Sequence, residues 1–251
     1  MTRIILHGCC GRMGQMITQI AVQDPSCEIV AGVDARGGES DSYPVYRTLA
    51  ECREEADALI DFSTAAAVYG LLAWCGERQM PCVLCTTGLS PEQEAVMREM
   101  AERVAILKSA NMSLGINLFF KVLQEAAAKL SAAGFDMEIV EKHHSQKLDA
   151  PSGTALALAD VINEAAGGDY EYVYDRSTRR QKRPEKEIGI SAVRGGTIVG
   201  DHDVIFAGED EVITFSHRAY SRAVFAKGAV EAAKFLAGKG PGLYTMSDVI
   251  G

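Results

Sequence analysis

Apolar and polar positions alternate in a regular way along the N-terminal part of the chain. Short apolar runs such as Ile4 to Leu6 are separated by longer stretches in which apolar residues recur with helical spacing. This alternation is typical of a parallel sheet whose strands are joined by crossover helices, so we predict a doubly wound α/β domain. We expect strands near 3–7, 28–34, 57–62, 81–85 and 104–107, and helices over Gly14–Val22, Ala65–Arg78 and Pro91–Arg103.

The pattern changes at Ser113. Helical spacing from Leu118 to Leu130 leads into an alternating run that begins at Phe135, and a further helix is expected over 152–166. Three β-rich runs follow, with turns too short for crossover helices, over 188–193, 197–206 and 211–216. We therefore predict a second, α+β unit with a mostly antiparallel sheet. The periodicity of a last helix, over 221–236, leaves open which unit it packs on.

The composition is that of a folded globular protein. Of 251 residues, 47% are hydrophobic and 24% are charged, which excludes a disordered or fibrous chain. No apolar stretch has the length of a membrane helix and no signal-peptide pattern is present, so we expect a cytoplasmic protein. The net charge of −9 argues against nucleic-acid or membrane binding. The basic stretch 176–186 has no aromatic residue, and we expect a solvated loop at a sheet edge.

The seven cysteines do not follow the spacing of a disulfide framework or a metal site. Most lie in apolar runs, and the Cys-x-x-Cys pair of Cys82 and Cys85 lies inside a predicted strand without a second pair to complete a zinc site. The histidines His7, His202 and His217 are isolated in the sequence. We therefore expect reduced thiols and no bound metal.

A glycine-rich turn follows the first predicted strand. Gly8, Gly11 and Gly14 are spaced so that the chain bends tightly and its backbone can approach a pyrophosphate at the start of a helix. The second strand ends at Asp34, where a carboxylate would hold a ribose diol and repel a 2′-phosphate. This favours NAD, although Arg36 can offset the negative charge and leaves NADP open. The alternative is a glycine turn that binds no dinucleotide.

A second polar cluster extends from Glu141 to Thr154. His143 and His144 are followed by Lys147 and by a Pro-Ser-Gly-Thr turn that opens a helix, which places proton donors and anion-binding N–H groups in one loop. Because adjacent strand residues point to opposite faces, we expect at most one of the two imidazoles to reach a given reacting atom. The alternative is a polar loop with a helix cap at Ser152.

Both clusters, in this order, resemble the 4-hydroxy-tetrahydrodipicolinate reductase (dihydrodipicolinate reductase) family over nearly the whole chain. The most specific stretch is His-His-x-x-Lys-x-Asp-Ala-Pro-Ser-Gly-Thr at 143–154. Further matching segments are Gly8–Gly14, Asp61–Ser63, Thr86–Gly88, Ala110–Gly115, Val193–Gly196, Gly200–His202 and Ser221–Arg222.

The resemblance implies hydride transfer to a cyclic imine dicarboxylate from NADH, from NADPH or from both. Water is lost in this reaction, which belongs to lysine and diaminopimelate biosynthesis. The resemblance implies that His143 donates or accepts a proton and that Lys147 donates a proton or hydrogen bond beside the substrate. It implies that His144 and the amides of Gly153 and Thr154 hold the substrate carboxylates. The residues that match the family's cofactor-binding segments are Gly8, Cys9, Cys10, Gly11, Arg12, Met13, Asp34, Cys85, Thr86, Thr87, Ser109, Ala110, Asn111 and Met112.

The resemblance also implies the domain organisation. Residues 1–112 and 222–251 would form the dinucleotide-binding domain, and residues 113–221 an inserted domain for substrate binding and oligomerisation. A homotetramer built through the sheet of the inserted domain is the family pattern. Cys85 departs from the family, which usually has glycine there, so its bulk is expected to affect the approach to the nicotinamide.

The sequence leaves two other functions open. The first is another NAD(P)-dependent dehydrogenase of a small amino or keto dicarboxylate, which would share the first domain but not the His-His-x-x-Lys loop. The second is a non-catalytic sensor that binds a dinucleotide without transferring hydride, which leaves the polar loop unexplained.

Overall fold

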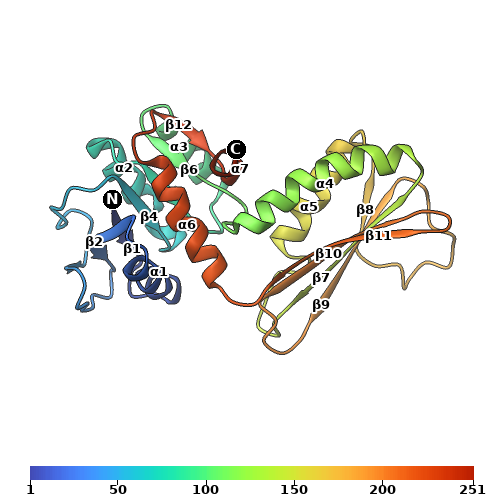
Figure 1. Ribbon diagram of the computed structural model, residues 1–251, viewed down its shortest axis with the longest axis horizontal. Coiled ribbons are helices and arrows are strands. Elements are labelled where there is room, and N and C mark those ends of the chain that lie inside the picture. The colour runs from blue at the N-terminus through green and yellow to red at the C-terminus, as the bar shows by residue number, and fades with distance from the viewer. The chain divides into compact units, whose positions relative to one another are not determined.

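The computed structural model describes all residues from 1 to 251, and the chain divides into two compact units. The first unit consists of Met1–Leu114 and Arg222–Gly251, and the second is the intervening Gly115–Ser221. Each unit has its own sheet, as the labelled strands of Figure 1 show. The last long helix, which the periodicity did not assign, belongs to the first unit.

The sheet of the first unit has seven strands, and every pair of neighbours is parallel. Its order is β12-β6-β5-β4-β1-β2-β3, so the direction of winding reverses between β1 and β4. In doubly wound sheets, ligands bind beyond the carboxyl ends of the strands at such a reversal. The strands are β1 (Thr2–His7), β2 (Cys27–Val33), β3 (Val45–Tyr46), β4 (Ala58–Asp61), β5 (Cys82–Leu84), β6 (Ala105–Leu107) and β12 (Gly242–Tyr244).

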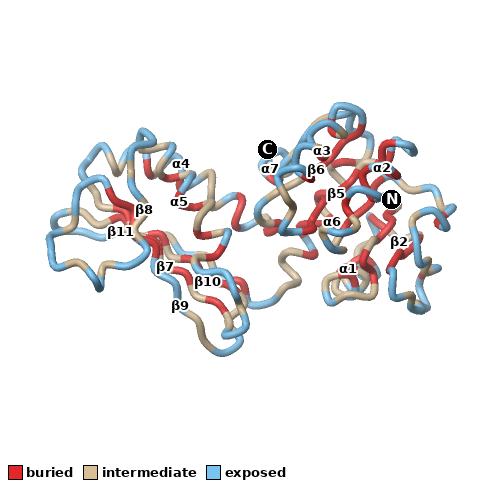
Figure 2. Tube along the Cα trace, turned by 180° about the vertical axis from the view of Figure 1, so that it is seen from behind, coloured by how far each residue is buried: buried red, intermediate tan, exposed pale blue.

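Helices cover both faces of this sheet. Because successive strand residues point to opposite faces, Ile4 and Leu6 enter the core beneath α1 and α6, whereas Ile5 enters the core beneath α2 and α3. Figure 2 shows the buried residues concentrated on the strands. The helical elements are α1 (Arg12–Gln23), a short 3₁₀ helix (Ala65–Ala67), α2 (Val68–Arg78), α3 (Pro91–Ala101), α6 (Ala223–Leu236) and α7 (Met246–Ile250).

The start of α3 illustrates how the local sequence fixes an element. The Ser90 hydroxyl accepts a hydrogen bond from the Gln93 N–H, and the Gln93 side chain accepts one from the Ser90 N–H. Pro91 occupies the first helical position, where its missing N–H has no cost. This reciprocal cap satisfies two backbone groups that would otherwise lack partners.

The second unit packs two helices on one face of a five-stranded sheet. Alternate residues of β7, including Met137 and Ile139, are buried against α4 and α5, together with Val204 and Phe206 of β10. The sheet order is β11-β10-β7-β9-β8. The elements are α4 (Leu114–Ala132), β7 (Asp136–His143), α5 (Gly153–Ala165), β8 (Glu171–Val173), β9 (Glu187–Arg194), β10 (Gly200–Ala207) and β11 (Val212–Ala219).

The prediction of a mostly antiparallel second sheet is only partly correct. The β10–β11 and β7–β10 pairs are antiparallel, but the β7–β9 and β8–β9 pairs are parallel, so the sheet is mixed. The cause is α5, which acts as a crossover from β7 to β8, followed by the long loop from β8 to β9, so that β8 and β9 both run parallel to β7. The short turn after β9 does reverse the chain direction, but β10 then pairs on the other side of β7 rather than with β9.

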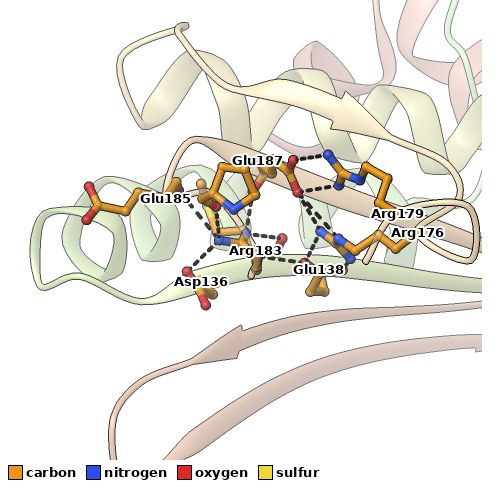
Figure 3. A network of polar contacts seen from close by, with 9 residues as sticks. Asp136, Glu138, Arg176, Arg179, Arg183, Glu185 and Glu187 are labelled. Atoms are coloured by element: carbon orange, nitrogen blue, oxygen red, sulfur yellow. Dashed lines mark hydrogen bonds and ion pairs between the residues drawn. The ribbon is translucent and has the colours of Figure 1, made fainter. Parts of the chain in front are cut away.

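The basic stretch is not simply solvated. Arg176, Arg179 and Arg183 are half-buried and form ion pairs with carboxylates of β7 and β9, as Figure 3 shows. Arg176 contacts Glu138 through two nitrogens at 2.8 and 2.7 Å. Arg179 contacts Glu187 in the same way at 2.7 and 2.9 Å. The expected loop is therefore held to the sheet by its charges.

Candidate active site

The glycine turn after β1 has no room for side chains at two positions. Gly8 has a φ of +81°, and a Cβ there would lie 2.5 Å from the carbonyl oxygen of Phe62. A Cβ at Gly14 would lie 2.4 Å from the carbonyl oxygens of both Gly8 and Cys9. Glycine is therefore required for the conformation of the turn and for the close approach of α1.

Asp34 follows β2 and is tied to the same turn. Its carboxylate accepts hydrogen bonds from the backbone N–H of Cys10 at 3.1 Å and from the backbone and Nε of Arg36 at 3.1 and 3.3 Å. Burial raises the pKa of Asp34, but these hydrogen bonds outweigh it and hold the pKa below its ordinary value. Asp34 is therefore ionised at neutral pH.

Two pockets lie at the carboxyl ends of the strands of the first unit, and their volumes are about 480 and 460 Å³. The first is lined by the glycine turn, by Asp34 and by the segment after β4, and the second by Cys85 and the segment after β6. The first includes His7, Gly8, Gly11, Asp34, Arg36, Phe62, Ser63 and Thr64, and the second Gly11, Arg12, Met13, Phe62, Cys85, Thr87, Ser109, Ala110, Asn111, Met112, Arg222 and Phe225.

Three predicted cofactor residues lie elsewhere. Cys9 and Cys10 line a smaller pocket of about 270 Å³, although the Cys10 backbone still contacts Asp34. The side chain of Thr86 is buried and is not among those that line the two larger pockets. Its hydroxyl donates a hydrogen bond to Oδ2 of Asp61 at 2.6 Å.

Asp61 is the centre of a buried polar network that the sequence reasoning did not assign to a site. Oδ1 accepts hydrogen bonds from Nδ1 of His7 at 2.8 Å and from the Ser63 N–H at 3.2 Å. Burial raises the pKa of Asp61, but its hydrogen bonds, that of His7 first, lower it below the ordinary value. The available signal was position, because Asp61 and His7 both end neighbouring strands.

In the second unit, His143 is the last residue of β7 and is buried. Its Nδ1 lies 2.6 Å from Oε2 of Glu141, which is fully buried. Burial lowers the pKa of His143, and the opposing effect of Glu141 does not restore it. The imidazole is therefore neutral at pH 7.

His202 of β10 lies next to His143, with ring centroids 5.2 Å apart. Its Nε2 is 3.1 Å from the hydroxyl of Ser152, and burial lowers its pKa to about 3. His202 therefore carries no charge at neutral pH, and the two imidazoles do not repel each other at this short distance.

The loop after β7 brings together the remaining predicted groups. His144 is half-buried, and Nζ of Lys147 lies 2.7 Å from Oδ1 of Asp149. Ser152 caps α5 by accepting a hydrogen bond from the Ala155 N–H at 3.1 Å. Gly153 and Thr154 form the first turn of α5, where the helix dipole favours an anion.

The predicted residues thus fall into two sets. All predicted cofactor-binding residues belong to the first unit, and His143, His144, Lys147, Gly153 and Thr154 belong to the second. All seven cysteines are free thiols, and no group of three or more side chains is arranged to hold a metal ion. No helix combines the length and the hydrophobicity needed to span a bilayer.

Comparison with known protein families gives matches to both units. Residues 2–112 match the family described as dihydrodipicolinate reductase, N-terminus, and residues 115–250 match dihydrodipicolinate reductase, C-terminus. The chain is 53% identical to 4-hydroxy-tetrahydrodipicolinate reductase of Caldanaerobacter subterraneus subsp. tengcongensis over 100% of its own length and 98% of that protein. It is 49% identical to the enzyme of the same name from Clostridium botulinum, over 100% and 99% of the two chains.

Among solved structures, dipicolinate-bound dihydrodipicolinate reductase from Paenisporosarcina sp. TG-14 is similar, with a TM-score of 0.80 and 25% identity over 98% of this chain and 97% of that one. Amine dehydrogenase from Mycobacterium smegmatis shares the fold, with a TM-score of 0.61 at 12% identity over 98% and 95% of the chains.

Proposed function

The chain belongs to the dihydrodipicolinate reductase family, and from this membership we propose that it reduces 4-hydroxy-tetrahydrodipicolinate to tetrahydrodipicolinate with loss of water, in lysine and diaminopimelate biosynthesis. The observation that carries the proposal is the neutral, buried His143 at the end of β7, joined by the loop that contains Lys147 to the N-terminus of α5. This arrangement offers proton transfer and anion binding together, which a cyclic dicarboxylate requires. The structure from Paenisporosarcina was solved with dipicolinate bound.

The residues of the first unit fit a nicotinamide dinucleotide. The positive φ of Gly8 gives the tight turn that leads into α1, and backbone N–H groups at the start of α1 suit a pyrophosphate. Asp34 is ionised and would bind a ribose diol. When bound, the reduced nicotinamide supplies the hydride. We expect a lower KM for NADH than for NADPH, because the pairing with Arg36 offsets only part of the charge of Asp34.

The cofactor segments act together in this proposal. Arg12 and Met13 would lie beside the pyrophosphate. Both line the pocket of about 460 Å³, whose other walls include Cys85, Thr87 and residues 109–112. Cys9 and Cys10 would contribute backbone rather than thiol groups, and Thr86 would act through Asp61. Cys85 is buried and burial raises its pKa well above the ordinary value, so it would form an uncharged wall.

In the second unit, His144, Lys147 and the amides of Gly153 and Thr154 would hold the substrate carboxylates. Nε2 of His143 would remove a proton from the carbon between the imine carbon and the carbon that carries the hydroxyl. The hydroxyl would leave as water by taking a proton from Lys147, and the new double bond would be conjugated with the imine. The carbon that lost the hydroxyl would accept the hydride, and His143 would return its proton to the neighbouring carbon.

We also propose that the protein works in the cytoplasm as a homotetramer assembled through the second sheet. The face of this sheet opposite α4 and α5 has no helix of its own unit on it, and it exposes Val193 and Val212. An assembly through this face would remove both side chains from water.

The experiment that tests the function supplies freshly made 4-hydroxy-tetrahydrodipicolinate to the purified protein and follows the absorbance of reduced nicotinamide with NADH and NADPH in parallel. Substrate-dependent oxidation is expected, faster with NADH at low cofactor concentration. If a folded protein oxidises neither cofactor although the substrate is shown to be present, the proposal is wrong and a sensor or another dehydrogenase takes its place.

A further inference from the structure

We propose that Glu141 and Arg194 are positioning residues of the reductase site, which fix the tautomer and orientation of His143 and tie it to the N-terminus of α5. The inference rests on the proposed function for its kinetic consequences. Its structural part, the state of the His143 ring, can be tested separately.

Glu141 is a fully buried carboxylate with a complete set of partners. Oε2 accepts from Nδ1 of His143 at 2.6 Å and from one nitrogen of Arg194 at 2.8 Å. Oε1 accepts from the other terminal nitrogen of Arg194 at 2.7 Å and from the backbone N–H of Ser152 at 3.0 Å. An ionised carboxylate can only accept, so the four contacts leave no ambiguity about the direction of any of them.

This arrangement determines which nitrogen of His143 is available. Nδ1 must carry the proton that it donates to Glu141, so Nε2 is the proton acceptor in the neutral ring. Gly200 lies beside this nitrogen, and a Cβ there would be 3.0 Å from Nε2. The absence of a side chain at position 200 therefore keeps space beside the reactive nitrogen.

The same carboxylate links three segments of the second unit. Arg194 lies opposite His143 in the register of β9 and β7, and it also donates to the carbonyl oxygen of Asp149 at 2.6 Å. Ser152 is the N-cap of α5. Glu141 therefore sets the distance between the imidazole and the helix terminus proposed to hold a substrate carboxylate.

A purely structural role explains this site less well. A buried ion pair is often no more stabilising than apolar residues of the same shape, and here Nε of Arg194 is buried without a partner. Of the other groups that face His143, Lys147 from the following loop and Arg194 from β9 lower its pKa, and the ring of His202 from β10 packs edge-on against it. Glu141 is the group that favours the charged form during proton transfer.

The test compares Glu141→Gln, Arg194→Met and Glu138→Gln by steady-state kinetics across pH. Glu138 is a matched control, because it lies on the same strand, is bonded by arginines and faces away from His143. We expect Glu141→Gln to lower kcat by about 10²-fold or more, as loss of the correct tautomer does in other enzymes, with the dissociation constant for NADH unchanged. Glu138→Gln should stay within about twofold of the wild type.

The pH profile separates positioning from simple structural damage. Glu141 raises the pKa of His143 and Arg194 lowers it, so the acid limb of kcat/KM should move to lower pH in Glu141→Gln and to higher pH in Arg194→Met. The inference is wrong if Glu141→Gln retains the wild-type kcat, or if Glu138→Gln loses as much.

A measurement on the wild-type protein covers the case in which the variants do not fold. In ¹⁵N-histidine-labelled protein near neutral pH, Nδ1 of His143 should be protonated and Nε2 should not, and the opposite tautomer overturns the inference. If the wild type has no reductase activity but His143 shows this tautomer, the proposed function fails and the positioning geometry stands.

Discussion

The backbone N–H of Cys10 donates a hydrogen bond to the carboxylate of Asp34 over 3.1 Å, so the turn after β1 and the end of β2 are held together by the residue proposed to bind the ribose. Arg36 occupies the other carboxylate oxygen, while its side chain stays largely exposed. The carboxylate is thus fixed in position and its charge is only partly compensated.

Asp34→Ser should shift cofactor preference toward NADPH. Loss of the carboxylate removes repulsion of a 2′-phosphate and leaves Arg36 free to bind it, so the ratio of KM for NADPH to KM for NADH should fall by about tenfold or more. Parallel titrations with both cofactors measure the ratio. A wild-type enzyme that uses only NADPH contradicts the role given to Asp34.

His143→Ala and Lys147→Ala should each lower kcat by about two to four orders of magnitude, because each removes a group that moves a proton or stabilises charge. The dissociation constant for NADH should not change, since the cofactor residues belong to the other unit. Leu148→Ala is a control in the same loop, as this side chain is 98% exposed. Full activity in both variants would show that the roles assigned to His143 and Lys147 are wrong.

The activity should persist to a lower pH than an ordinary histidine would allow. Burial lowers the pKa of His143, and the ring must be neutral to accept a proton, so kcat/KM should fall only as the pH drops through this lowered value. We expect the acid limb to lie below about pH 6.5. A pH profile of kcat/KM measures it, and a midpoint above that value contradicts the expectation.

Most elements of the first unit could be predicted because each strand is a continuous apolar run between helical patterns. The predicted strands at 3–7 and 28–34 correspond to β1 and β2. The short strands β3, β8 and β12 were missed, because two or three residues carry no periodicity and their pairing depends on distant partners. The mixed second sheet was missed for the related reason that turn length sets direction but not neighbours.

Part of the candidate site could also be predicted from the sequence, and part could not. Residue types and spacing identified the glycine turn and the His143 loop, because their chemistry lies in contiguous sequence. The roles of Glu141 and Arg194 depend on strand register, which brings residues from β7 and β9 together. Protonation states such as that of His202 depend on burial in the folded protein, which the amino-acid sequence alone does not reveal.

Arg183→Ala should lower the thermal stability of the protein. Arg183 contacts Glu138, Asp136 and the carbonyl oxygens of Met137 and Glu187, so its loss removes several hydrogen bonds that hold the basic stretch to the sheet. We expect Tm to fall by about 3–8 °C. Arg180→Ala is the control, since this neighbouring arginine is exposed, and calorimetry of both variants gives the comparison. An equal Tm for both indicates that the network in Figure 3 contributes nothing to stability.

The order of strands has a consequence for how the chain matures during synthesis. β12 pairs with β6, and α6 supplies Ala226 and Val230 to the core that covers β1, so the first unit lacks part of its core until the last residues have been made. β7 likewise has no pairing partner until β9 and β10, its two neighbours in the second sheet, have been made. A nascent chain that ends near residue 113 would expose one apolar face of its sheet, and the first unit can complete its core only after the whole second unit has been made.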